Sequence, residues 1–328
     1  MQKRSRLIDI LRGILIVLVV AAHYNREFPH DIVFLFHMPL FFIISGFLLN
    51  KSKLLNEDGY LFLKVKSLFL PYAIYLLADF LLVQRRLSMI DLIKMIWGGR
   101  TIVGVYWYIT CYLFSLLIFS ALLKKFPDKT SKALILVGGG IAVIESHLVD
   151  KIHLLQSPGI PWDLDVSLMA LVYISIGFFY KNKIKELLES DSKKYDLTAG
   201  IVAAVLALFC WFIYRDGNRL YYFDMKPVYY KELISAIVIP CAFGIVLVRL
   251  VHWMEKTKWL DGLNRFLALC GQATIPIMFM HIPLNHWKDS LGYGRVEFLV
   301  IGICVPLAFT LIFNRYKFMR KLFGLPKL

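Results

Sequence analysis

The sequence has no polar stretch long enough to fold as a separate soluble domain. Of its 328 residues, 59% are apolar and 19% are charged, and the mean hydropathy is +0.64. Apolar segments long enough for a hydrocarbon core of ~30 Å recur from one end of the chain to the other. This composition excludes a pair of soluble domains and predicts a single membrane-embedded domain over residues 1–328.

Cysteine is scarce too, and its spacing excludes a disulfide framework. The chain has five cysteines, none forms a Cys-x-x-Cys pair, and each lies in or at the end of an apolar segment. Cysteines in that setting behave as small apolar residues. We therefore expect neither a structural disulfide nor a metal site.

Acidic residues are few, with 23 Asp and Glu against 38 Lys and Arg, so the net charge is +15. A basic chain can bind nucleic acid, but no basic stretch here alternates with aromatic residues as a single-strand groove requires. The basic residues lie instead in short loops between apolar segments, where they fix orientation and contact anionic lipid. We therefore expect the lipid bilayer, and no nucleic acid, as their partner.

The apolar segments predict an all-α, polytopic bundle of about ten spans. If the N-terminus is cytoplasmic, 25 of the 38 Lys and Arg residues lie on the cytoplasmic side, so the positive-inside rule predicts both termini inside. We expect the plasma (inner) membrane. Arg12 interrupts the first apolar segment and argues against a cleaved signal peptide. The predicted spans are 7–24, 33–50, 67–84, 104–123, 133–149, 164–180, 197–214, 231–251, 264–283 and 296–314.

The first span carries Arg12 and His23, and ionisable residues within spans indicate function by default. Eleven residues of α-helix bring the second side chain to within ~20° of the first, about 16 Å further along the axis. The two side chains therefore share one stripe, with Arg12 nearer the cytoplasm. The alternatives are an arginine that snorkels or pairs with Asp9, and an interfacial histidine without a chemical role.

Other polar residues gather at the same predicted level as His23, on the outer side. His37 opens the second span there, and His281 closes the ninth. Glu145 closes the fifth span, while Asp163 and Asp165 open the sixth. A histidine oriented by a carboxylate can act as a general base on a hydroxyl group. Residues at loop edges are often polar, however, so His37 and His281 could equally be structural.

The first fifty residues resemble the acyltransferase 3 family of membrane O-acyltransferases. The matching residues are Asp9, Arg12-Gly13 and His23, with ten residues between the arginine and the histidine, followed by FHMPLFFIISGF at 36–47. The resemblance is weaker beyond this point but covers nearly the whole chain. Its later matches are Lys64-Val65-Lys66 with Leu70-Pro71-Tyr72, Tyr106-Trp107-Tyr108, Pro161-Trp162-Asp163-Leu164-Asp165 and His281-Ile282-Pro283.

The resemblance implies transfer of an acyl group, usually acetyl, from cytoplasmic acyl-CoA to a hydroxyl of an extracytoplasmic or lipid-linked carbohydrate. On this hypothesis acetyl-CoA is the donor, and Lys64 and Lys66 hold its phosphates. Arg12 contacts the CoA arm or a phosphate. His23 is the general base, or carries the acyl group transiently. The two lysines have an alternative explanation, because positive-inside bias alone would also place them there.

The remaining candidates are assigned to the acceptor. Glu145, Asp163 or Asp165 would orient a histidine or bind sugar hydroxyls, with Glu145 counted among the catalytic residues. Trp107 and Trp162 could stack on sugar rings, although aromatic belts explain most tryptophans at membrane interfaces. His37 and His281 complete this acceptor set.

Two other functions fit an intramembrane arginine and histidine. One is a glycan or proton-coupled transporter or flippase, in which both residues bind or relay; the absence of a detectable internal repeat argues mildly against it. The other is an anchoring or sensing domain without chemistry. The sequence does not identify the acceptor sugar, the acyl group or the oligomeric state.

Overall fold

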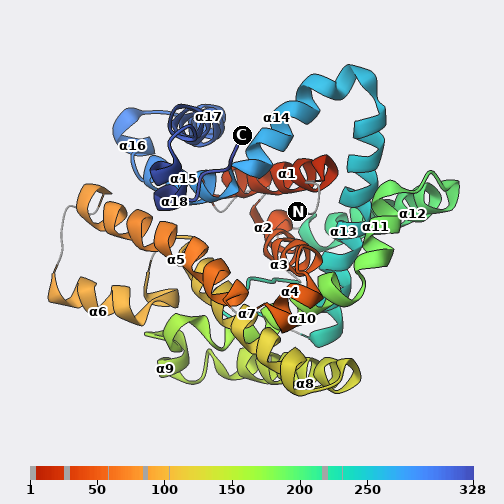
Figure 1. The fold of residues 1–328 in the computed structure, drawn as a ribbon, viewed down its shortest axis with the longest axis horizontal. Helices are drawn as coiled ribbons and strands as arrows, with labels where there is room; N and C mark the ends of the chain where they lie inside the picture. The colour runs from red at the N-terminus through yellow and green to blue at the C-terminus, as the bar shows by residue number, and fades with distance from the viewer. Residues whose placement is uncertain are drawn as a thin grey trace. The chain divides into compact units, whose positions relative to one another are not determined.

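The computed structural model describes residues 5–25, 30–57, 59–83, 88–102, 104–215, 221–230 and 232–328. Within these residues the chain is helical, apart from one isolated β-bridge between Asp224 and Tyr229 (Figure 1). Lys3 and Arg4, which contribute to the predicted charge bias, lie outside the described residues. The chain divides into two compact units, each assembled from three separate segments.

Unit 1 comprises residues 1–48, 173–225 and 229–272. It contains the first helices of the chain and the helices from Lys181 to Gln272. Its elements are α1 (Arg6–Ala22), α2 (His30–Phe34), α3 (His37–Phe47), the part of α10 (Val166–Phe179) from Tyr173 onward, α11 (Lys181–Glu189), α12 (Lys193–Tyr214), α13 (Leu233–Lys256), η4 (Lys258–Leu260) and α14 (Asp261–Gln272).

Helices α1 and α14 pack with their backbones in contact (Figure 1). A Cβ atom on Gly13 would overlap the carbonyl oxygen of Leu267, and a Cβ atom on Gly271 would overlap that of Asp9. Small residues allow this close approach between membrane helices. The glycine beside Arg12 therefore has a packing role, which the sequence left open.

A second reciprocal crossing joins α3 to α10. A Cβ atom on Gly46 would overlap the carbonyl oxygen of Ile174, and a Cβ atom on Gly177 would overlap that of Ile43. Gly46 belongs to the segment that carries the family resemblance, so part of that motif serves helix packing.

The charged segment 181–196 is held against α13 by two basic residues of that helix, Arg249 and His252. Arg249, with a side chain only 3% exposed, donates to the carbonyl oxygens of Leu187 and Ser190, both at 2.8 Å. It also pairs with Asp196. His252 contacts the carbonyl oxygen of Leu188 at 2.8 Å through Nδ1. The end of α11 thus has its free carbonyl groups satisfied by the neighbouring helix.

Unit 2 comprises residues 49–172, 226–228 and 273–328. Its elements are α4 (Lys51–Asn56), α5 (Tyr60–Ala78), the π-helical turn η1 (Asp79–Val83), α6 (Met89–Trp97), the 3₁₀ turn η2 (Gly99–Thr101), α7 (Trp107–Lys125), α8 (Asp128–Leu148), α9 (His153–Gln156), the 3₁₀ turn η3 (Pro161–Asp163), α10 up to Val172, α15 (Thr274–His286), α16 (Lys288–Leu291), α17 (Arg295–Phe313) and α18 (Lys317–Phe323).

Aromatic side chains form a continuous row through the core of unit 2. The ring of Tyr106 lies 5.1 Å from Phe279, which lies 4.9 Å from Tyr75, and Tyr75 lies 5.7 Å from Phe323. Tyr106 also donates its hydroxyl to the Tyr75 carbonyl at 3.0 Å. The row ties α5 to α7, α15 and the C-terminal helix α18.

Within the described ranges, eight helices are long and apolar enough to cross a bilayer, and the bent pair Lys258–Gln272 and Thr274–His286 would add a ninth. Helix α1, at 17 residues, spans about 26 Å, somewhat less than a ~30 Å hydrocarbon core. The all-α membrane architecture is therefore confirmed, whereas ten spans, the side of the termini and the single domain stay predictions.

One predicted span is not a continuous helix. The segment 264–283 breaks at Ala273 into α14 and α15. Pro276 lies in the first turn of α15, the position where a helix tolerates a proline because the missing N–H has no intrahelical partner. The proline therefore favours a restarted helix over an uninterrupted one.

We predict that Gly13→Ala destabilises the protein by about 1–3 kcal/mol, because the added methyl group overpacks the α1–α14 crossing. The matched control is Gly200→Ala in α12, where nothing lies within 4 Å of the new Cβ atom. Thermal unfolding in detergent measures both variants. A Gly13→Ala protein as stable as Gly200→Ala would contradict the backbone contact.

Candidate active site

His23 is the residue at which α1 ends. Its backbone N–H donates to the carbonyl oxygen of Val19, and its ring Nδ1 lies 2.7 Å from the same oxygen. A carbonyl oxygen can only accept, so Nδ1 carries the hydrogen and Nε2 carries the lone pair of the neutral ring. His23 therefore has the tautomer that a general base acting through Nε2 requires.

The same local bond recurs at the other two candidate histidines. His37, the first residue of α3, contacts the carbonyl oxygen of Val33 at 2.8 Å through Nδ1. His281, in α15 of unit 2, contacts that of Ile277 at 2.9 Å. Both are buried, at 2% and 0% exposure. Each ring thus has its Nε2 as the basic atom, as at His23.

In unit 1, the Phe34 ring brings histidines from three segments together. Its centroid lies 5.6 Å from His23, 4.7 Å from His37 and 3.9 Å from His30. Nδ1 of His30 lies 3.0 Å from the Asp31 carboxylate. Phe34 therefore fixes the rings of His23 and His37 on neighbouring sides of one aromatic residue.

Arg12 lies half-buried on α1, eleven residues before His23. Because α1 is unbroken from Arg6 to Ala22, the predicted separation of about 16 Å along one stripe follows from helix geometry. Asp9, the expected partner of Arg12, is 4% exposed and accepts a hydrogen bond from Gln272 at 3.1 Å. Gln272 is therefore a hydrogen-bond donor to the carboxylate that the sequence analysis assigned to Arg12.

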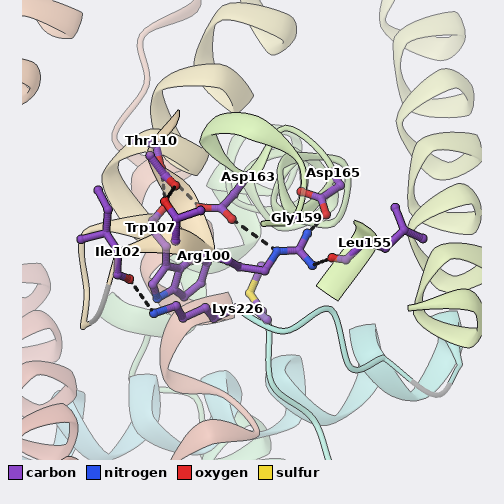
Figure 2. Close-up of polar contacts among 12 residues, drawn as sticks. Arg100, Ile102, Trp107, Thr110, Leu155, Gly159, Asp163, Asp165 and Lys226 are labelled. Carbon is purple, nitrogen blue, oxygen red and sulfur yellow. Dashed lines mark hydrogen bonds and ion pairs between the residues drawn. The ribbon is translucent and has the colours of Figure 1, made fainter. Parts of the chain in front are cut away.

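In unit 2, the three predicted acids converge on Arg100, and Figure 2 shows Asp163 and Asp165 beside its guanidinium. The guanidinium pairs with Asp165 through Nη2, lies 3.7 Å from Asp163 through Nε, and lies 3.9 Å from Glu145 through Nη2. Its Nη1 donates to the carbonyl oxygen of Leu155 at 2.8 Å. We call Arg100, Glu145, Asp163 and Asp165 the Arg100 cluster.

The members of the Arg100 cluster come from four segments and are withdrawn from solvent. Glu145 lies in the last turn of α8, Asp163 ends η3, Asp165 directly precedes α10, and Arg100 lies in η2. Their side chains are 13%, 0%, 5% and 7% exposed, respectively. Removing one partner from such a buried pair leaves an uncompensated charge, which is strongly unfavourable.

Left-handed backbone conformations surround the Arg100 cluster. Trp162 and Asp163 have φ values of 58° and 55°, which is rare for residues with a side chain. At Gly99, with φ +58°, an added Cβ atom would lie 2.8 Å from the Asp163 carboxylate. At Gly159, with φ +74°, it would lie 3.0 Å from Nε of Arg100. Strained backbone of this kind gathers at functional sites.

The Trp162 indole is held on several sides. Its Nε1–H donates to the carbonyl oxygen of Ile96 at 2.7 Å, and its ring stacks parallel to Phe69 at 6.0 Å between centroids. Phe114 meets it edge-on at 5.8 Å. The left-handed turn thus places this indole in a defined position within unit 2.

Trp107 is a buried residue of the helix beside the cluster. It is 6% exposed and begins α7. Its carbonyl oxygen accepts from the Thr110 hydroxyl at 2.9 Å, and that hydroxyl lies 3.4 Å from Asp163. Trp107 therefore neighbours the Arg100 cluster through the first turn of α7.

Lys64 and Lys66 lie on α5, the helix that also carries Phe69. Lys64 is half-buried and Lys66 is exposed. Phe69 follows them by five and three residues, a rise of about 5–8 Å along the helix. The predicted donor lysines therefore lie on the same stretch of α5 as Phe69, the residue that stacks on Trp162.

Arg100 and Gly99 are the site residues that the sequence analysis missed. The sequence placed Arg100 among the outer basic residues without a role. Two signals pointed to it: the glycine pair before it, and the need of three predicted outer acids for a buried cation. The candidates fall into two groups, one around Phe34 in unit 1 and one around Arg100 in unit 2, and the roles of all of them stay predictions.

Comparison with protein families gives one match. The family model Acyl_transf_3, described as an acyltransferase domain, matches residues 6–315. No curated protein and no solved structure matches the chain. The family match covers the Arg12–His23 stripe and the whole Arg100 cluster.

We predict that Gly99→Ala destabilises the protein more than Gly59→Ala does. Both glycines have positive φ, but only at Gly99 would the methyl group meet a carboxylate, whereas nothing lies within 4 Å at Gly59. Each variant loses about 1 kcal/mol from backbone strain, and Gly99→Ala loses about 1–3 kcal/mol more from overpacking. Thermal unfolding in detergent measures the difference, and equal losses would contradict the close approach of Asp163.

Proposed function

Because this chain belongs to the acyltransferase 3 family, we propose that it transfers an acyl group, in the simplest case acetyl, from cytoplasmic acyl-CoA to a carbohydrate hydroxyl. The family match and the apolar helices identify a multi-pass membrane acyltransferase. The proposal adds the acyl-CoA donor, an extracytoplasmic or lipid-linked acceptor and a location in the plasma (inner) membrane. The observation that carries it is the fixed tautomer of His23.

In the proposed reaction, His23 is the general base. The acceptor O–H bond breaks as Nε2 takes the proton, the oxygen bonds to the acyl carbon, and the carbon–sulfur bond of the thioester breaks. The proton then passes from the imidazolium to the departing CoA thiolate, so His23 returns to its neutral form. The bond from Nδ1 to Val19 at 2.7 Å stabilises the imidazolium while it exists.

The donor is assigned to Arg12 of the first predicted span and to the two lysines that precede the third. Lys64 and Lys66 would hold the CoA phosphates by charge-assisted contacts. Arg12, on the stripe that leads to His23, would contact the pantetheine arm or a phosphate.

The acceptor is assigned to the carboxylates and aromatic residues of unit 2. Among the described residues, no hydrogen bond reaches the buried oxygen Asp165 Oδ1, whereas Glu145 Oε1 and Asp163 Oδ1 face the Arg100 guanidinium at 3.9 and 3.7 Å. A carboxylate oxygen accepts hydrogen bonds, and sugar hydroxyls donate, so we assign Asp165 Oδ1 to an acceptor hydroxyl. His37, His281, Trp107 and Trp162 remain proposed acceptor contacts.

We predict that His23→Gln lowers acetyl transfer by about 10²–10⁴-fold, since the amide cannot take the acceptor's proton. The control is His147→Gln, because His147 is an exposed residue of α8 without a proposed role. Incorporation of label from [¹⁴C]acetyl-CoA into membrane glycans measures transfer. Full transfer by His23→Gln would remove His23 from the mechanism, and no transfer by the unmodified protein would favour a transporter.

We predict that Lys64→Gln/Lys66→Gln raises the KM for acetyl-CoA about tenfold and leaves kcat within about twofold, because phosphate contacts contribute to ground-state binding. Lys129→Gln is the control, an exposed lysine on the predicted cytoplasmic side. Initial rates against donor concentration measure both constants. An unchanged KM in the double variant would leave positive-inside bias as the explanation for the pair.

A further inference from the structure

The Arg100 cluster gathers more buried carboxyl groups around one guanidinium than a structural ion pair needs. Three carboxylates face one guanidinium, and all four side chains are at most 13% exposed. The nearby Lys226 donates through Nζ to the carbonyl oxygens of Ile102 and Gly104 at 3.0 and 3.1 Å, and its charge also acts on Asp163 (Figure 2). Well-packed apolar residues usually stabilise a fold as well as buried ions do, so stability alone does not explain this arrangement.

Arg100 contacts the turn at Trp162 and Asp163, where both residues have a strained, left-handed backbone. Arg100 contacts residues on both sides of Trp162: Leu155 before it, and Asp163 and Asp165 after it. Two consecutive residues with side chains adopt positive φ at Trp162 and Asp163. Such a conformation persists only where the surroundings determine it. The guanidinium supplies that constraint, since it ties both ends of the turn to η2.

The turn also determines which groups an acceptor would meet. It fixes the Trp162 indole against Phe69 and fixes the carboxylates of Asp163 and Asp165 beside Glu145. Without the guanidinium, the three carboxyl groups would lose the partner that they share, and the left-handed turn would relax. The indole and the carboxylates would then lose their mutual geometry.

We propose that Arg100 is a positioning residue for acceptor recognition, which holds the left-handed turn at Trp162 and Asp163. In this arrangement the carboxylates of the Arg100 cluster accept hydrogen bonds from the acceptor's hydroxyl groups. The inference rests on the proposed function for its substrate. It concerns a residue to which neither the family match nor the sequence gives a role. Arg100 acts through the turn and not on the reacting atoms.

The test uses the full chain with three changes at Arg100. Arg100→Lys keeps the charge and loses the planar guanidinium, which can bridge several carboxylates at once. Arg100→Gln loses both. Arg100→Gln/Asp165→Asn removes one positive and one negative group, so the net charge of the cluster is unchanged and the folded protein is better preserved. Arg265→Gln is the control, because Arg265 is 74% exposed and pairs with Asp261 in α14.

The first readout does not require catalysis. Leu164 lies between Asp163 and Asp165 and is 41% exposed, so a thiol at Leu164→Cys reports on the turn. We expect maleimide to label this thiol about tenfold faster when Arg100→Gln is added, because the turn opens locally. We also expect a glycan extract of the expressing cells to slow maleimide labelling of the Leu164→Cys protein. The extract should not slow labelling of the protein that also carries Arg100→Gln. An unchanged labelling rate would overturn the proposal.

The second readout separates positioning from a merely structural role. Arg100→Gln should raise the KM for the glycan extract about tenfold and leave the KM for acetyl-CoA within about twofold, with Arg100→Lys in between. Because Asp165 is itself a proposed acceptor contact, Arg100→Gln/Asp165→Asn should raise the KM for the glycan extract at least as much. Equal rises in both constants, or a loss of folded protein alone, would contradict a role in acceptor recognition. If the unmodified protein transfers no acetyl group, the proposed function fails, while labelling of Leu164→Cys still decides whether Arg100 holds the turn.

Discussion

A polar side chain within apolar helices must find its partner in the protein, because the bilayer core supplies no water. The histidines meet this constraint locally, since His23, His37 and His281 each bond through Nδ1 to the carbonyl oxygen four residues earlier. Arg100 meets it at long range, by collecting partners from α8, α9 and the turn before α10. The local bond fixes a proton, whereas the long-range cluster fixes a backbone conformation.

Glycine positions make these arrangements compatible with close helix packing. Gly13 directly follows Arg12 and brings α1 against α14, so the helix with the candidate arginine and histidine is held at its N-terminal half. Gly99 and Gly159 serve the Arg100 cluster differently, because they remove Cβ atoms that would meet Asp163 and Arg100. In both places the absent side chain decides where a charged residue can lie.

The sequence was sufficient to predict the helical membrane architecture and the family, because each depends on local periodicity or a short motif. It also placed Glu145, Asp163 and Asp165 at one level. It could not reveal that Arg100 joins them, since that contact depends on the long-range path of η2 and η3. The break at Ala273 was missed although Gly271, Gln272 and Thr274 interrupt the apolar segment there and Pro276 marks the restart.

Sites held by local hydrogen bonds and sites held by long-range ion pairs respond differently to substitution. The bond from His23 to Val19 depends on one turn of α1, so it persists as long as that helix is formed. The Arg100 cluster depends on four segments at once, so the loss of one partner affects the geometry of all the others. The hydrogen bond that orients His23 is therefore robust, whereas the geometry of the Arg100 cluster is sensitive to substitutions in several segments of unit 2. On the proposed function, acceptor preference could then change without loss of the transfer chemistry, because the two tasks would rest on separate sets of contacts.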